Sequence, residues 1–181
     1  IREAKSEGRY PAIVVPEPTC GYVLKNDYVD YVGGPDAALV AEHTFDACEY
    51  LMSAHKDDKS AGGDGLDTDF VGTIPETTTY HAPCHLRAQN VGLKSRDLIK
   101  LTGTKVTVVA ECSGIDGTWG LRAENLEPAR KVAKKMAAAI EKADSEAVAG
   151  DCTLANGGIE LETGRNPGHP LSLMARAYGI P

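Results

Sequence analysis

The residues best suited to chemistry are cysteines, of which the chain has five, and four of them follow predicted strands. Cys84, Cys112 and Cys152 lie in turns rich in glycine, proline or polar residues, which are poor places for a core-filling side chain. Cys20 follows a fourth predicted strand, whereas Cys48 lies on an apolar helix face and is expected in the core. Three thiolates gathered at one edge of a sheet would make a soft, anionic pocket suited to an iron–sulfur cluster or zinc.

Histidine and glycine residues surround these cysteines. His81 and His85 flank Cys84, and an imidazole is able to act as a metal ligand, a proton donor or a hydrogen-bond partner to sulfide. We expect both to act as hydrogen-bond partners before ligands, and both are candidates for a metal site. Gly114 follows Cys112 closely. Because a glycine amide can approach and donate to anionic sulfur, Gly114 is a candidate for cofactor binding.

Other kinds of site find little support. No G-x-G-x-x-G motif follows a strand, and no G-x-x-x-x-G-K-S/T motif occurs, so a nucleotide site is unsupported. Ser113 does not lie in a G-x-S-x-G elbow, which argues against a serine hydrolase. A cysteine nucleophile paired with His81 or His85 is an alternative that the residue types allow. It would leave the other cysteines at strand ends unexplained.

Composition narrows the class of protein further. The chain has 181 residues, 42% of them hydrophobic, and a net charge of −7, which fits one large or two small globular domains. It has no basic face for nucleic acid or an anionic membrane and no run of 18 apolar residues. The first residue is Ile1, and no apolar signal segment is found, so we expect a piece of a longer protein in a reducing, cytoplasmic compartment.

The first part of the chain is predicted to contain one strand and two helices. Pro16 to Gly21 is a breaker-rich turn that places Cys20 in a loop, and Asp36 is a predicted N-cap. The predicted segments are a strand over 12–15, helices over 23–31 and 37–55, and a mobile surface loop over 56–69.

The second part alternates strands with helices. The predicted strands cover 77–80, 105–110 and 147–149, and the predicted helices cover 93–101, 124–143 and 171–178. Within the longest helix, the buried stripe is expected to include Leu126, Val132, Met136 and Ile140. This order predicts an α/β fold with a mostly parallel sheet and helices on both faces. Ligands bind beyond the carboxyl ends of such strands, where Cys84, Cys112 and Cys152 should meet.

Several of these segments resemble one known family. They are Tyr80 to Leu86 (Y-H-A-P-C-H-L), Glu111 to Gly120 (E-C-S-G-I-D-G-T-W-G), Asp151 to Ala155 (D-C-T-L-A) and the tail from His169 to Gly179. Together they resemble the cysteine-rich CCG domain. That domain occurs in the B subunit of heterodisulfide reductase, the C subunit of anaerobic glycerol-3-phosphate dehydrogenase, and the iron–sulfur subunits of glycolate and lactate oxidases. The resemblance is clearest over residues 75–181.

Such domains usually occur as tandem pseudo-repeats. The resemblance implies that residues 1–73 are the C-terminal part of a first domain with a connecting helix and mobile loop, and that residues 74–181 are a second domain. The family pattern is Cys, then Cys-Cys-Gly, then Cys-x-x-Cys. Here Ser113 stands where the second cysteine of Cys-Cys-Gly is expected, and Ala149 stands three positions before Cys152. Three of the five ligands remain.

The resemblance implies an electron-transfer domain, a component of an oxidoreductase related to heterodisulfide reductase or anaerobic glycerol-3-phosphate dehydrogenase. The implied cofactor is a [4Fe–4S] cluster held by Cys84, Cys112 and Cys152, with zinc as the alternative. His81, His85 and Cys20 are the candidates for a fourth ligand. The implied partner is a flavoprotein or a membrane- or quinone-linked redox protein, which would hold the chain at the inner face of the membrane. A structural zinc domain and a metal-free assembly scaffold remain open.

Overall fold

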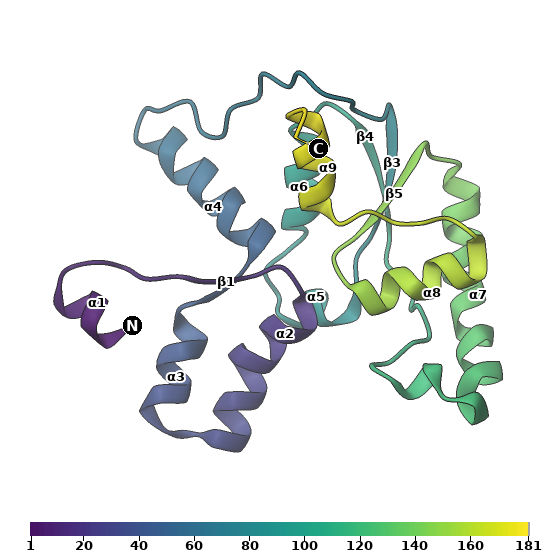
Figure 1. Cartoon of the computed structure of the whole chain (residues 1–181), viewed down its shortest axis with the longest axis horizontal. Helices are drawn as coiled ribbons and strands as arrows, with labels where there is room; N and C mark the ends of the chain where they lie inside the picture. The colour runs from purple at the N-terminus through teal and green to yellow at the C-terminus, as the bar shows by residue number, and fades with distance from the viewer. Residues whose placement is uncertain (181) are drawn as a thin grey trace.

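The structure is a computed structural model that describes residues 1–180, and its helices and strands alternate along the chain (Figure 1). The strands are β1 (Ile13–Val15), β2 (Thr44–Asp46), β3 (Thr77–His81), β4 (Lys105–Val109) and β5 (Ala147–Gly150). The α-helices are α1 (Arg2–Ser6), α2 (Pro18–Tyr22), α3 (Gly34–Glu42), α4 (Ala47–Ser60), α5 (Cys84–Ala88), α6 (Lys94–Lys100), α7 (Leu126–Ala143), α8 (Thr153–Thr163) and α9 (Pro170–Ala177). A π-helix, η1 (Val23–Val32), and two 3₁₀ turns, η2 (Trp119–Leu121) and η3 (Ala123–Asn125), complete the set.

The larger sheet has three parallel strands in the order β4-β3-β5. Its register aligns the strand ends, because His81 lies opposite both Val109 and Gly150. The predicted strands of the second part of the chain are therefore confirmed. Beyond β5, a single parallel bridge joins Ala149 to Gly168 and extends the sheet at that edge.

Helices cover both faces of this sheet, and each face has its own apolar cluster. On one face Tyr80 and Ala149 pack with Ile99 of α6 and Leu173 of α9. The other face carries a second cluster, made by Val109, Val148, Met136, Ile140 and Ile159, from the strands, α7 and α8. Neighbouring strand residues thus point to opposite faces, as the pleat requires. The predicted α/β class, with a parallel sheet between helices, is confirmed.

The strand connections create a crevice at the carboxyl ends of β3 and β5. The chain leaves β3 toward α6 on one face, whereas it leaves β5 toward α8 on the other. Adjacent parallel strands whose connections diverge in this way form a topological switch point, the usual place for a ligand in an open α/β sheet. The fold therefore favours a site at this edge.

Residues before β3 form a separate two-stranded parallel sheet, β1-β2, with its own helices. The helix predicted over 37–55 is wrong, because β2 interrupts it and divides it into α3 and α4. The predicted N-cap Asp36 is also wrong, because Asp36 lies in the first turn of α3, whose N-cap is Gly33. The N-cap of α4 is Asp46: its carboxylate accepts hydrogen bonds from the amides of Cys48 and Glu49, and Glu49 completes a capping box. Pairing of β2 with β1 then overrides the helical pattern.

Three smaller expectations also need correction. Cys20 lies inside α2, not in a loop. Residues 56–60 of the expected loop are the last turns of α4. On α7, Leu126 and Val132 are 39% and 47% exposed, and the buried stripe instead combines Met136 and Ile140 with alanines. Small alanine side chains let α7 lie close to the sheet, and Leu126 and Val132 lie outside this buried stripe.

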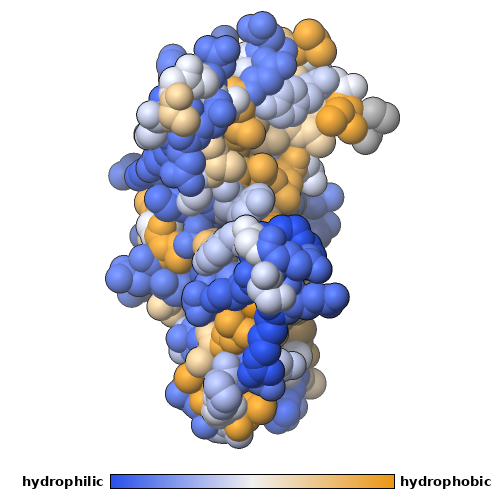
Figure 2. Space-filling view, turned by 90° about the vertical axis from the view of Figure 1, so that its left-hand side faces the viewer, coloured by the Kyte–Doolittle hydropathy of each residue, from blue (hydrophilic) through white to orange (hydrophobic). Residues whose placement is uncertain are grey.

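The two parts of the chain share a third apolar cluster. Cys48 and Met52 of α4 pack against Leu98 of α6 and Met174 of α9. The expected burial of Cys48 is thus confirmed. Figure 2 views the molecule from the side of α1, α3 and α4, where hydrophilic residues dominate and apolar residues gather only in small groups. Among the described residues, no helix has the length and apolar character needed to cross a bilayer.

Candidate cofactor site

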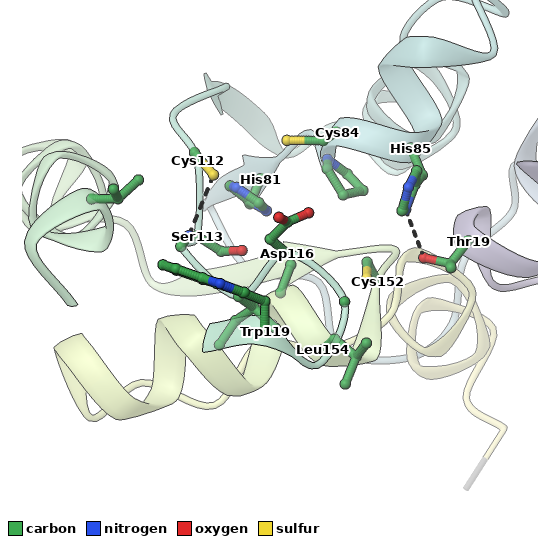
Figure 3. A pocket seen from close by; sticks show the side chains of 16 residues that line it. Thr19, His81, Cys84, His85, Cys112, Ser113, Asp116, Trp119, Cys152 and Leu154 are labelled. Carbon is green, nitrogen blue, oxygen red and sulfur yellow. Dashed lines mark hydrogen bonds between the residues drawn. The ribbon is translucent and has the colours of Figure 1, made fainter. Parts of the chain in front are cut away.

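A cavity of about 340 Å³ lies at the carboxyl ends of the three strands (Figure 3). The register explains why the cysteines meet there. Cys84 and Cys112 each follow the last residue of their strand by three positions, and Cys152 follows the end of β5 by two. All three line the cavity, together with Thr19, His81, Pro83, His85, Ser113, Gly114, Ile115, Asp116, Gly117, Trp119, Val132, Leu154 and Ala155. The predicted convergence of Cys84, Cys112 and Cys152 on one cavity is what the structure shows.

Cys84 and Cys112 are exposed, and both thiols receive hydrogen bonds. Arg87, one turn further along α5, places its Nη2 3.5 Å from Cys84 Sγ. The backbone amide of Gly114 donates to Cys112 Sγ at 3.4 Å. A guanidinium and an amide are both hydrogen-bond donors that complement the electron density of sulfur. The expected position of Gly114 beside a sulfur is also found.

The turn after Cys112 depends on glycine. Gly114 has φ +76°, and a Cβ there would lie 3.0 Å from the carbonyl carbon of Ala129 on α7 and closer still to its oxygen. Gly120 is similarly tight, because a Cβ there would lie 3.0 Å from Cβ of Ala129. Close backbone contact with α7 therefore holds the Cys112 turn against the cavity.

Cys152 is buried and directly follows a residue of a buried polar network. Its neighbour Asp151 is fully buried and accepts hydrogen bonds from Tyr80, at 2.6 Å, and from Ser95. Burial raises the pKa of Asp151, while these two hydrogen bonds oppose the rise. The pKa of Asp46 is raised to about 6, first by burial and next by the charge of Asp151. The network ties the β5 turn to β3 and α6.

His81 lines the cavity from the end of β3 and is only 2% exposed. Its Nε2 lies 2.9 Å from the backbone carbonyl oxygen of Glu111, the residue before Cys112. Its Nδ1 is buried and has no hydrogen-bond partner among the described residues. Burial, more than any neighbouring charge, lowers the pKa of His81. The imidazole is therefore neutral at pH 7.

His85 also lines the cavity but has different partners. Its Nδ1 lies 3.0 Å from the hydroxyl of Thr19, and its ring packs at 5.3 Å from that of Tyr22. Thr19 thus brings the first part of the chain to the cavity, a role that the sequence did not indicate. Cys20, the next residue, is exposed and does not line the cavity.

Further hydrogen bonds join the turn after β1 to the residues that precede or begin α8 and α9. The Glu17 carboxylate accepts from the amide and hydroxyl of Thr153 at the start of α8. His169 Nε2 lies 3.0 Å from the carbonyl oxygen of Pro16. Because the N-cap residue of α8 is Cys152, Glu17 supplies the cap that the cysteine side chain lacks.

The chain is similar to known proteins over the segments that form this site. Residues 78–154 match the family model described as a cysteine-rich domain, CCG. The chain is also 26% identical over 179 residues to the C subunit of the anaerobic glycerol-3-phosphate dehydrogenase of Escherichia coli K12 and to that of strain O157:H7. Each match covers 98% of this chain and 43% of the relative, so the chain spans less than half the length of these proteins.

The structure changes which residue replaces a cysteine of the CCG pattern. Ala149 is completely buried in the cluster on the α6 face, away from the cavity. Ala155 stands three positions after Cys152 and lines the cavity, as does Ser113. A Cys-x-x-Cys pair that serves this cavity would therefore be Cys152 with position 155. The expected pairing of Cys152 with position 149 is wrong.

The donors surround the cavity without meeting at one point. Within residues 1–180, no three Cys, His, Asp or Glu side chains are close enough together to hold a single metal ion. A tetrahedral zinc site with Zn–S bonds of about 2.3 Å brings its sulfurs to about 3.8 Å from one another. A cluster of several iron atoms takes its thiolates from more widely spaced positions. Soft donors around a cavity of about 340 Å³ thus fit an iron–sulfur cluster better than a single zinc ion.

Proposed function

We propose that the chain is an electron-transfer domain that holds an iron–sulfur cluster on Cys84, Cys112 and Cys152. One observation carries this proposal: the carboxyl ends of three adjacent parallel strands deliver three thiols to one cavity. The match of residues 78–154 to the CCG family supports it. When bound, the cluster would supply a one-electron couple.

The protein residues have separate tasks in this proposal. The three thiolates hold the cluster, and the Gly114 amide and Arg87 guanidinium stabilise negative charge on sulfur. The apolar side chains Ile115, Trp119, Val132 and Leu154 line the same cavity. They limit the access of water, which helps to set the reduction potential.

Anaerobic reconstitution with iron and sulfide tests the proposal. We expect the wild-type chain to retain iron, labile sulfide and an EPR signal, and serine at position 84, 112 or 152 to lose most of all three. Cys20→Ser and Cys48→Ala are matched controls, because neither side chain lines the cavity. Wild-type iron content in all three ligand variants would overturn the proposal. Tight binding of one zinc without labile sulfide would indicate the structural zinc domain instead.

A third outcome would indicate a metal-free scaffold. In that case the exposed thiols of Cys84 and Cys112 would react with an alkylating reagent in the chain incubated with iron and sulfide, and serine substitutions would leave its stability unchanged. Under the proposal, loading with iron and sulfide protects these thiols from alkylation, whereas Cys20 stays reactive because it is exposed.

We also propose that the chain is a component of an oxidoreductase of the glycerol-3-phosphate dehydrogenase type. The relatives are named as the C subunit of such an enzyme. A flavoprotein would then donate electrons, and a quinone-linked partner would receive them. Reduced flavin should reduce the loaded chain anaerobically, and a soluble quinone should reoxidise it. A cluster signal that responds to neither reagent would contradict this assignment.

The domain arrangement is a further part of this proposal. Residues 1–73 would be the end of one CCG-like unit, and residues 74–181 would form a second. β1 leads through Cys20 and helices to β2, which pairs parallel with β1 and starts α4. In the same way β5 leads through Cys152 and α8 to Gly168, which bridges to Ala149 before α9.

The third apolar cluster predicts that these two units unfold together. Cys48 and Met52 contribute to it from one unit, and Leu98 and Met174 from the other. Urea unfolding followed by circular dichroism and by Trp119 fluorescence should give coincident transitions. Two separate transitions would show that the units are energetically independent.

A further inference from the structure

We propose that His81 Nδ1 is the fourth protein ligand of the cluster, in place of the thiolate missing at position 113. This inference rests on the proposed function and concerns a residue of this chain that the three-thiol site does not use. The proposed ligand is one nitrogen atom of one side chain, which spectroscopy can detect.

Hydrogen bonding fixes the tautomer of His81. The partner of Nε2 is a backbone carbonyl oxygen, that of Glu111, which can only accept a hydrogen bond. Nε2 therefore carries the proton. In the neutral ring this leaves Nδ1 unprotonated, with its lone pair available. A metal-binding histidine commonly donates its other ring nitrogen to a backbone carbonyl in this way.

The position of His81 fits a role in the cavity. The ring lines the cavity, yet Nδ1 is buried and unpartnered among the described residues. Leaving such a polar atom without a hydrogen-bond partner or a ligand is unfavourable, so its position calls for a partner. The hydrogen bond to Glu111 also ties His81 to the residue next to Cys112. A ligand at Nδ1 would thus act beside the turn that carries Ser113.

The other donors near the cavity fit this role less well. His85 Nδ1 already lies 3.0 Å from the Thr19 hydroxyl. Cys20 does not line the cavity. Asp116 and Ser113 do, but their oxygen atoms are harder donors than imidazole nitrogen and suit iron–sulfur chemistry less well. His81 is therefore the favoured candidate.

A neutral imidazole has a consequence for the redox couple. Replacing a thiolate by imidazole removes one negative charge from the ligand set, which stabilises the reduced state. The reduction potential should therefore lie above that of the His81→Cys variant, in which four thiolates would hold the cluster. This difference is independent of the activity of any parent enzyme.

Pulsed EPR of the reconstituted, reduced chain tests the assignment. The wild-type chain is grown with ¹⁵N-histidine, and we expect a strong ¹⁵N hyperfine coupling of a directly bound nitrogen. His85→Ala is the matched control, since His85 lines the same cavity and flanks Cys84; it should retain this coupling. His81→Cys should lose the coupling, keep the cluster and lower the reduction potential.

The outcomes separate this inference from the proposed function. A wild-type chain that binds iron and sulfide without histidine coupling would overturn the role of His81 and leave the cluster proposal standing. A wild-type chain that takes up no cluster would overturn the cluster proposal itself. Because the hyperfine measurement uses the wild-type chain, a folding defect in a variant does not affect it.

Discussion

Substituting Gly114 by alanine tests two features of the Cys112 turn, its positive φ and its close contact with α7. Gly114 and Gly117 both have positive φ, +76° and +61°. A Cβ at Gly114 would press on the Ala129 backbone, whereas a Cβ at Gly117 meets no atom within 4 Å. Gly117→Ala is therefore a matched control that carries the backbone strain alone.

The expected costs follow from these contacts. A left-handed conformation costs a residue with a side chain about 1–2 kcal/mol, which is the whole expected effect of Gly117→Ala. At Gly114 the clash is with the backbone of α7, which has no rotamer to change. Overpacking of this kind adds about 1–3 kcal/mol. Gly114→Ala should therefore lower the free energy of unfolding by about 2–5 kcal/mol, the sum of the two costs.

Urea unfolding monitored by circular dichroism measures both variants. We also expect Gly114→Ala to lower iron retention after reconstitution, because the turn displaced from α7 carries Cys112 and the amide that donates to it. Equal destabilisation by the two substitutions would refute the argument that contact with α7 holds this turn.

Three further predictions follow from the site. Ala155→Cys should raise iron retention, measured by iron analysis, because it adds a thiol to the cavity. Ala149→Cys should add no thiol to the cavity and should lower the free energy of unfolding, measured by urea titration, by about 1–3 kcal/mol. Tyr80→Phe should cost about 1–3 kcal/mol, measured by urea unfolding, because the buried Asp151 loses a donor. The raised pKa of Asp46 means that its protonated form stabilises the fold below about pH 4, and that this contribution is lost as the pH rises through about 6. Asp46→Asn keeps the N-cap, so the wild-type unfolding free energy should fall relative to this variant by roughly 2–3 kcal/mol across that range.

The three strands of the larger sheet were predictable because each is a β-favouring run that stops at a turn. The same pattern placed Cys84, Cys112 and Cys152 at one edge, which the register of β3 with β4 and β5 bears out. The strand β2 was hidden because Thr44–Asp46 is short and continues a helical pattern. The capping box of Asp46 and Glu49 is a local signal that could have revealed the start of α4.

Tertiary contacts explain features of α8 and of the cavity that the local sequence pattern does not predict. The helix α8 contains Gly157 and Gly158, which locally favour a turn. A Cβ at Gly158 would lie 3.0 Å from the Ile115 side chain, so its glycine reflects packing against the Cys112 turn. Thr19 and Ala155 reach the cavity through chain segments distant from Cys84, and no local pattern marks either of them as part of a site.

Iron and acid-labile sulfide analysis of the anaerobically reconstituted wild-type chain tests the central claim most directly. A [4Fe–4S] cluster on the three thiols predicts about four iron and about four sulfide per chain. The Cys84→Ser, Cys112→Ser, Cys152→Ser triple variant should retain neither. A wild-type chain that retains no more iron and sulfide than this triple variant would contradict the account.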